Sequence, residues 1–174
     1  MKGLKGFTFI AVVLGLMLYA SKGNAQTNPQ QAKTQQENSQ AQVRNLSTSS
    51  KQDAKNDLKR GLDLLEAEDY RGAIQAFSKV ISAEENNQYA YCARGISYFQ
   101  LEQDQEAKAD LDKSISLDTS NPYAYLFRGF TQKRLKNKQE AIADFQVAAN
   151  LFQKQGQTEM VKKALEELEN ARKS

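Results

Sequence analysis

The architecture of this chain can be read from residues 88–121, QYAYCARGISYFQLEQDQEAKADLDKSISLDTSN. This stretch is the middle copy of a 34-residue unit. Glycine keeps that spacing at Gly61, Gly95 and Gly129, and alanine keeps it at Ala73, Ala107 and Ala141. Two residue types held in register over three copies indicate an array of one small supersecondary unit. Aligned on the glycines, the units are 54–87, 88–121 and 122–155.

Each unit is predicted to fold as two helices, because helix-forming residues fill both halves and the break lies near the middle. Asp69, Gln103 and Asn137 stand at equivalent positions just before the second helix. Asp and Asn favour helix N-caps, and Asn137 followed by Glu140 is similar to a capping box. The expected helices are 54–67, 70–83, 88–101, 104–117, 122–135 and 138–153.

The three glycines lie in the middle of a helix, where each costs about 1 kcal/mol relative to alanine. That cost is tolerable if the missing side chain lets the second helix approach closely. We expect the alanine twelve residues later to face each glycine, and larger residues to fill the space around the contact. The predicted larger residues are Leu64, Phe77, Tyr98, Leu111 and Phe145.

These motifs resemble the tetratricopeptide repeat family, whose unit is a 34-residue helix–turn–helix. Repeat two carries Tyr91, Arg94, Gly95 and Tyr98, followed by Ala107 and Leu111. Repeat three has the matching set Tyr125, Arg128, Gly129, Ala141 and Phe145. The proline that the family usually places late in the unit is absent, and Glu85, Thr119 and Gln153 stand there. The resemblance implies an all-α solenoid of three repeats.

Residues 156–174 follow the last repeat and are predicted to form a capping helix from Thr158 to Arg172. Its apolar residues recur at helical spacing, and charged residues occupy the opposite side. Such a helix can cover the exposed end of a stack of repeats. The apolar stripe consists of Met160, Val161, Ala164, Leu165 and Leu168.

Residues 1–25 have the layout of a secretory signal peptide. Lys2 and Lys5 precede an uncharged apolar run from Gly6 to Ala20, and the small residues Gly23 and Ala25 favour cleavage before Gln26. We therefore expect an exported protein, periplasmic or secreted. The alternative is an uncleaved N-terminal anchor, the one arrangement in which we expect the chain to be held at a membrane.

Residues 26–53 form a Gln/Ser-rich tail with too few large apolar residues to fold, so we expect disorder there. The full chain has 24 Lys and Arg against 21 Asp and Glu. Loss of Lys2, Lys5 and Lys22 with the signal peptide leaves 21 − 21 = 0. The mature chain therefore lacks the positive charge that nucleic-acid binding requires.

The composition also argues against catalysis. The chain has no histidine, which removes Ser-His-Asp and Cys-His nucleophiles and the commonest metal ligand. No phosphate-binding loop or dinucleotide fingerprint is present. We predict a protein that is not an enzyme and has no cofactor, metal or small-molecule substrate. Cys92, the only cysteine, is either a small buried residue or a partly exposed thiol.

The resemblance implies that the first helix of each repeat lines a concave surface. On helices 88–101 and 122–135, a second apolar stripe lies beside the residues needed for internal packing, and a surplus of apolar surface favours an interaction site. Lys133 and Arg134 would favour an acid at one end of the ligand. The predicted groove is Tyr89, Cys92, Ile96, Phe99, Tyr123, Leu126, Phe130, Lys133 and Arg134.

The predicted function is therefore a non-catalytic scaffold or adaptor that docks a segment of a partner protein in this groove. Two alternatives stay open: neighbouring helices cover the surface, or two copies of a structural component pair through it. Some family members grip the carboxylate end of chaperone tails with Lys and Asn, but the matching positions here contain neither. Those positions are Leu58, Leu62, Ala93, Tyr123 and Phe127.

Arginine also recurs every 34 residues, as Arg60, Arg94 and Arg128. Such a ladder could bind an acidic partner. The interpretation that we favour is structural: each arginine packs its stem on neighbouring helices and pairs with a carboxylate nearby.

Overall fold

A computed structural model of the protein describes residues 50–173. The predicted signal segment and residues 26–49 of the predicted tail lie outside this range. The described part is all helical. No helix in it is both long enough and apolar enough to cross a membrane. Its seven helices are residues 50–66, α3 (Tyr70–Ala83), α4 (Gln88–Gln100), α5 (Asp104–Leu117), α6 (Pro122–Arg134), α7 (Lys138–Lys154) and α8 (Thr158–Lys173).

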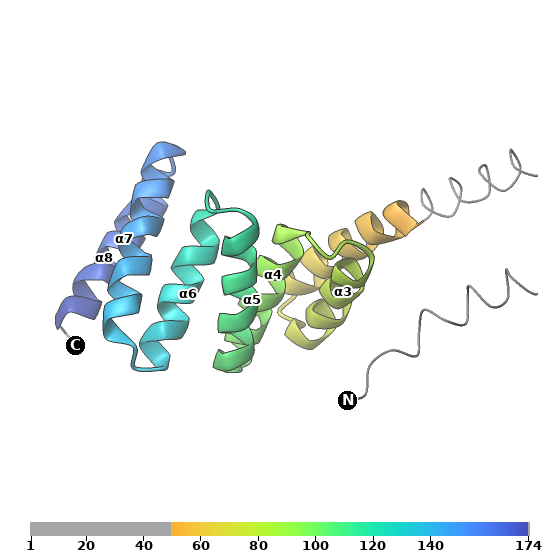
Figure 1. Ribbon diagram of the computed structural model, residues 1–174, viewed down its shortest axis with the longest axis horizontal. Helices are drawn as coiled ribbons and strands as arrows, with labels where there is room; N and C mark the ends of the chain where they lie inside the picture. The colour runs from red at the N-terminus through yellow and green to blue at the C-terminus, as the bar shows by residue number, and fades with distance from the viewer. Residues whose placement is uncertain (1–49, 174) are drawn as a thin grey trace, which may run out of the picture. The chain divides into compact units, whose positions relative to one another are not determined.

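Successive helices pack against each other as antiparallel pairs, so the repeats stack in sequence order (Figure 1). Hydrogen bonds join positions 34 residues apart in successive units. The Tyr123 hydroxyl donates to Gln157 Oε1 over 3.1 Å, and Lys133 Nζ donates to Glu167 Oε2 over 3.0 Å. Helix α8 therefore takes the place that the first helix of a fourth repeat would have.

The predicted helices agree with the observed ones to within one residue, except at the start of the first. That helix already includes residues 50–53, which we had assigned to the tail. Gln52 donates a side-chain hydrogen bond of 3.1 Å to Asn56, one turn further along. Lys51 and Gln52, which have good helix propensity, therefore favour extension of the first helix through these exposed positions.

The helix caps agree only in part with the sequence. Asp69 accepts a hydrogen bond of 3.0 Å from the Gly72 amide, as expected of an N-cap. The capping box predicted at Asn137 is wrong, because Asn137 makes no side-chain cap bond and its amide instead donates to Gln132 Oε1 over 2.7 Å. Gln132, near the end of the preceding helix, lies close enough to bind the Asn137 side chain in place of the cap.

Each turn between the two helices of a repeat contains a residue with left-handed backbone. Glu68, Glu102 and Lys136 have φ values of 60°, 59° and 62°. This position after a helix is where glycine is preferred, because other L-residues lose about 1–2 kcal/mol in the left-handed region. The three turns therefore store strain that recurs with the repeat.

We expect Lys136→Gly to stabilise the protein by about 0.5–1 kcal/mol. Relief of about 1–2 kcal/mol of left-handed strain outweighs the smaller gain in unfolded-chain entropy that glycine brings. The measurement is urea denaturation followed by circular dichroism. Ala143→Gly, an exposed change inside α7, is the control and should destabilise by about 1 kcal/mol. A loss of stability in Lys136→Gly would contradict the strain argument.

The mid-helix glycines make the close contacts that the sequence predicts, but with a different partner. A side chain added at Gly61 would lie 2.5 Å from the Phe77 ring, and one added at Gly129 would lie 2.7 Å from the Phe145 ring. At Gly95 the nearest group is Leu111, 2.9 Å away. The residue facing each glycine is therefore the large one sixteen positions later.

The alanines that we expected to face the glycines pack fully buried beside these contacts, and Ala107 also approaches its glycine, with its carbonyl oxygen 3.3 Å from a side chain added at Gly95. The glycine leaves room for a large side chain as well as for the close approach of the helix. The fully buried residues of this packing set are Ala73, Phe77, Ala107, Leu111, Ala141 and Phe145, while Tyr98 and Leu64 are only partly buried.

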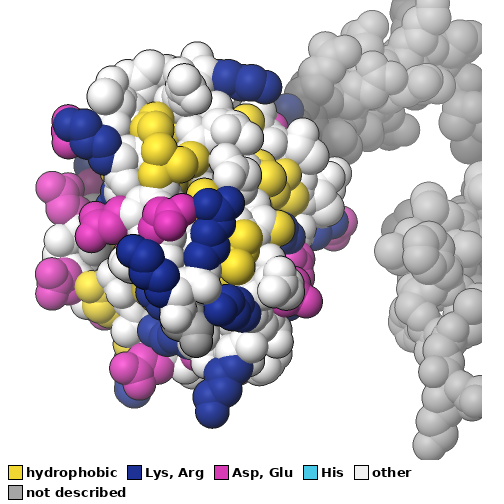
Figure 2. Space-filling view, turned by 90° about the vertical axis from the view of Figure 1, so that its left-hand side faces the viewer, with side chains coloured by type: hydrophobic (Ala, Val, Ile, Leu, Met, Phe, Trp, Pro, Cys, Tyr) yellow, Lys and Arg dark blue, Asp and Glu magenta, His cyan; other side chains and the backbone are white. Residues whose placement is uncertain are grey.

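Helix α8 closes the C-terminal end of the stack. Its Ala164, Leu168 and Ala171 are buried in one cluster with Phe145 and Phe152 of α7. Leu165, which we placed in the same stripe, is not buried and remains 42% exposed. Figure 2 views this end and shows acidic and basic side chains around separate, smaller hydrophobic areas.

Candidate functional site

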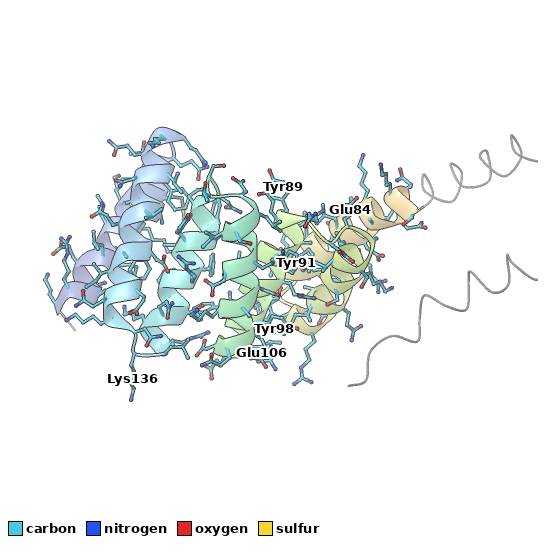
Figure 3. The ribbon with its side chains drawn as sticks, in the orientation of Figure 1. Glu84, Tyr89, Tyr91, Tyr98, Glu106 and Lys136 are labelled. Carbon is cyan, nitrogen blue, oxygen red and sulfur yellow. The ribbon has the colours of Figure 1, made fainter. Side chains whose placement is uncertain are left out.

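The nine predicted groove residues come from α4 and α6, the first helices of repeats two and three. Tyr89 is 62% exposed and Tyr123 is 39% exposed, each near the start of its helix. In Figure 3, Tyr89 lies at one end of α4 near Glu84, and Tyr98 lies toward the other end. Ile96, Phe99 and Phe130 are partly buried, so part of each side chain faces solvent.

Two of the predicted groove residues do not reach the surface. Cys92 packs in a buried cluster with Ala107 and Leu111, and Leu126 packs with Phe145. Their assignment to the groove is wrong. Spacing along one helix placed them correctly on the stripe, but the second helix of the repeat covers that part of it.

Burial also makes Cys92 inert. Removal from water raises the pKa of its thiol to about 11, although hydrogen bonds with Asn121 and Ser114 oppose the shift. At neutral pH the group is therefore the neutral thiol, which is the unreactive form. This supports the interpretation of Cys92 as a small core residue.

We expect Cys92 to resist a thiol reagent such as dithionitrobenzoate in the folded protein at about pH 8. Unfolding in guanidinium chloride should release the group, with one equivalent of thiol then reacting quickly. The two reaction rates provide the comparison. Rapid labelling before unfolding would show that the thiol is accessible.

A cluster of aromatic rings joins α4 to α6. The centroid of Phe99 lies 5.7 Å from that of Phe127 and 6.0 Å from that of Phe130, and Phe130 lies 5.3 Å from Phe145 below it. Phe127 was missing from the predicted groove. Its spacing of three residues from Phe130 could have indicated it, because such residues are neighbours on a helix surface.

The two cations predicted to attract an acidic ligand already have carboxylate partners. Lys133 pairs with Glu167 over 3.0 Å. Arg134 pairs with Asp104, lies 3.6 Å from the centre of the Phe99 ring and donates to the Phe99 carbonyl. These contacts hold neighbouring helices together. They also reduce the positive charge available to a ligand.

What is left of the groove is a mainly apolar surface on the first helices of the repeats. Leu62 is the residue of repeat one that corresponds to Ile96 and Phe130, and it is 49% exposed, so it extends this surface. We call this the inner-helix surface. Its residues are Leu62, Tyr89, Ile96, Phe99, Tyr123 and Phe130.

Two of the arginines at 34-residue spacing, Arg94 and Arg128, form clips inside the stack. Arg94 donates two hydrogen bonds, of 2.6 and 2.9 Å, to the carboxylate of Asp110 and a third to Ser78. Tyr91 and Tyr98, labelled in Figure 3, flank it with ring centres 5.6 and 6.0 Å from its guanidinium carbon. Each such arginine thus ties its own repeat to the one before.

Arg128 repeats this arrangement. It donates to both carboxylate oxygens of Asp144, over 2.9 and 2.6 Å, and to Asp112 of the preceding repeat over 2.7 Å. The carboxylates Asp110 and Asp144 raise the pKa of Arg94 and Arg128 respectively, so both stay charged. The structural interpretation of the ladder is correct for these two.

No metal site accompanies these features: in the part of the chain from residue 50 to 173, no three Cys, Asp or Glu side chains are grouped closely enough to hold an ion. Over residues 50–173 the geometry is that of packed helices with the inner-helix surface partly open.

Comparison with known proteins agrees with this geometry. Residues 89–121 match the sequence profile of the tetratricopeptide repeat. No curated protein sequence matches the chain. The TPR domain of Arabidopsis OM64 is similar, with 26% identity and a TM-score of 0.63 over 70% of this chain and 98% of that one.

Two other solved structures are also similar. The second TPR domain of human RPAP3, in complex with the HSP70 peptide SGPTIEEVD, shares 26% identity and a TM-score of 0.64 over 72% of this chain and 99% of that one. The type III secretion translocator chaperone SycD of Yersinia enterocolitica, 12% identical, has a TM-score of 0.66 over 70% of this chain and 92% of its own, a likeness of fold alone. The repeat register, the paired helices and these similarities together show an all-α solenoid of tetratricopeptide repeats, with the sequence profile of the repeat matched at residues 89–121.

Proposed function

We propose that this protein is an exported, non-catalytic scaffold that holds a segment of a partner protein on the inner-helix surface. One observation carries the proposal: Leu62, Tyr89 and Tyr123, each large and apolar or aromatic, are 49%, 62% and 39% exposed on the first helices of successive repeats. Exposed apolar surface that continues over several elements is typical of an interaction site. Aromatic rings are the side chains that most often anchor such interfaces.

The chemistry of the surface favours an apolar segment, such as the apolar face of an amphipathic helix. The RPAP3 domain was solved with a peptide that ends in two glutamates, valine and aspartate. Here the positions that match the family's carboxylate-gripping residues are Leu58, Leu62, Ala93, Tyr123 and Phe127. Since Lys133 and Arg134 are also paired within the chain, little positive charge is left for an acidic tail.

The test is quantitative capture of partners from the extracytoplasmic fraction of the native cell, identified by mass spectrometry. Tyr89→Ala combined with Tyr123→Ala should reduce capture of a specific partner at least tenfold, because both anchors are lost. Val147→Ala is the matched control, an exposed apolar residue on α7 away from this surface. Full capture by a folded double variant would show that the partner does not bind at the inner-helix surface.

A second candidate is a structural component in which two copies pair through the same surface. The exposed apolar side chains of the inner-helix surface are equally compatible with such a dimer. Sedimentation velocity of the mature chain separates the candidates. A concentration-dependent dimer that Tyr89→Ala and Tyr123→Ala dissolve would support pairing of copies, whereas a monomer would support an external partner.

The export part of the proposal makes its own prediction. If residues 1–25 are a signal peptide, the protein isolated from its native cell should begin at Gln26 and occur outside the cytoplasm. Intact-mass measurement and cell fractionation check both points. A native protein that retains Met1 and sediments with membranes would favour the uncleaved anchor.

A further inference from the structure

The arginine clips of repeats two and three have an incomplete counterpart in repeat one. Arg94 and Arg128 each bind the carboxylate that follows sixteen residues later, Asp110 and Asp144. Arg60 is at the same repeat position, but the residue sixteen positions later is Ala76. Within residues 50–173, Arg60 forms no ion pair. The first repeat therefore keeps the guanidinium of the clip and lacks its carboxylate.

The missing carboxylate leaves space at that place. Ala76 is 4% exposed, which is close to the 7% of Asp110 and the 4% of Asp144, so the three equivalent positions are similarly buried. A cavity of about 330 Å³ opens beside Ala76 and Arg60. It is also lined by Leu64, Asp69, Arg71, Gly72, Gln75 and Lys79.

The charge around this cavity is positive. Arg60, Arg71 and Lys79 line it, and in the described part of the chain none of them forms an ion pair. The one acid is Asp69, whose carboxylate accepts the Gly72 amide as the N-cap of α3. Three cations against one occupied carboxylate form a site that favours an anion.

A second cavity of about 350 Å³ adjoins the first, because Arg71 and Gln75 line both. Its other lining residues are largely apolar: Ile74, Tyr98 and Leu101, together with Gln103. A peptide whose anionic side chain binds at Arg60 could therefore place its next residue, if that residue is apolar, in the second cavity.

We propose that the cavity at Arg60 binds the carboxylate of an aspartate or glutamate side chain from a partner protein, with an adjacent apolar residue in the second cavity. The carboxylate would take the place relative to Arg60 that Asp110 takes relative to Arg94, with two parallel hydrogen bonds to one guanidinium. This site shares no residue with the inner-helix surface. It stands independently of the function proposed above.

The first test completes the clip from within the chain. Ala76→Asp should restore the internal pair with Arg60 and raise the midpoint of thermal unfolding. Ala143→Asp adds the same charge at an exposed place on α7 without an arginine opposite, and it is the matched control. In an Arg60→Met background the gain from Ala76→Asp should vanish. A gain that persists there, or a drop in the midpoint below that of the control, would overturn the proposed geometry.

The second test measures binding directly. The probe is the blocked dipeptide acetyl-Glu-Leu-amide, titrated into the mature protein and followed through the backbone amide resonances of Gly72, Gln75 and Ala76. We expect saturable shifts, at least tenfold weaker binding of acetyl-Gln-Leu-amide, and the same loss in Arg60→Met and in Ala76→Asp. Tyr89→Ala should bind the probe normally, which separates this site from the inner-helix surface.

Inorganic phosphate is titrated separately in the same assay. If phosphate binds at least tenfold more tightly than the dipeptide, the cavity is a phosphate site and the proposed acidic peptide is wrong. Equal binding of the Glu and Gln dipeptides, or binding that survives Ala76→Asp, would exclude a carboxylate site at Arg60.

Discussion

Arg128→Met is expected to lower the free energy of unfolding by about 3–5 kcal/mol, since removing one partner of a buried ion pair leaves the other charge uncompensated. Asp144 is buried and receives two hydrogen bonds from Arg128. Methionine keeps much of the stem that packs between the repeats, so the loss reports on the charge and its hydrogen bonds. Urea denaturation at neutral pH provides the measurement.

Two further variants separate this charge effect from a general effect of losing arginine. Arg172→Met removes an arginine whose ion pair with Glu169 is exposed, and should cost less than about 1 kcal/mol. The double variant Arg128→Met, Asp144→Leu replaces both charges by apolar groups and should recover much of the loss. Equal effects of Arg128→Met and Arg172→Met would mean that the clip contributes little to stability.

Removal of α8 by truncation after Gly156 is expected to destabilise the array by more than about 4 kcal/mol. The helix buries Leu168, Ala164 and Ala171 and covers part of α7, and full burial of one leucine alone contributes about 1.5–3 kcal/mol. The exposed side of α7 would then also favour association between chains. The unfolding midpoint in urea and the sedimentation coefficient record the two consequences.

Point variants locate the effect on one side of the helix. Leu168→Ala, at a residue 2% exposed, should cost about 2–4 kcal/mol because it leaves a cavity. Leu165→Ala, one turn away and 42% exposed, should cost less than about 1 kcal/mol. A truncated chain as stable as the full one would refute the capping role of α8.

The helices and their order could be predicted closely because they depend on spacing. Glycine at Gly61, Gly95 and Gly129 marks the same place in each unit, and hydrophobic periodicity over a whole helix averages out the influence of any single residue. The caps were less predictable. Whether Asn137 caps α7 depends on its competing contact with Gln132, which a local pattern does not contain.

The candidate site shows the same division. The sequence correctly indicates that Tyr89 and Tyr123 lie on one stripe of their helices, yet Cys92 and Leu126 on the same stripes are buried. Which part of a stripe remains open depends on the second helix of the repeat. The availability of Arg134 to a ligand depends in the same way on Asp104, thirty residues earlier.

The repeat length, the number of repeats and the helical class thus follow from the sequence, because they rest on local propensity and on periodic spacing within one helix. The exposure of each ring and the carboxylate partners of Arg94 and Arg128 emerge only in the folded chain. These features arise where helices distant in sequence are brought within contact distance, and no pattern within a single helix specifies which groups meet there.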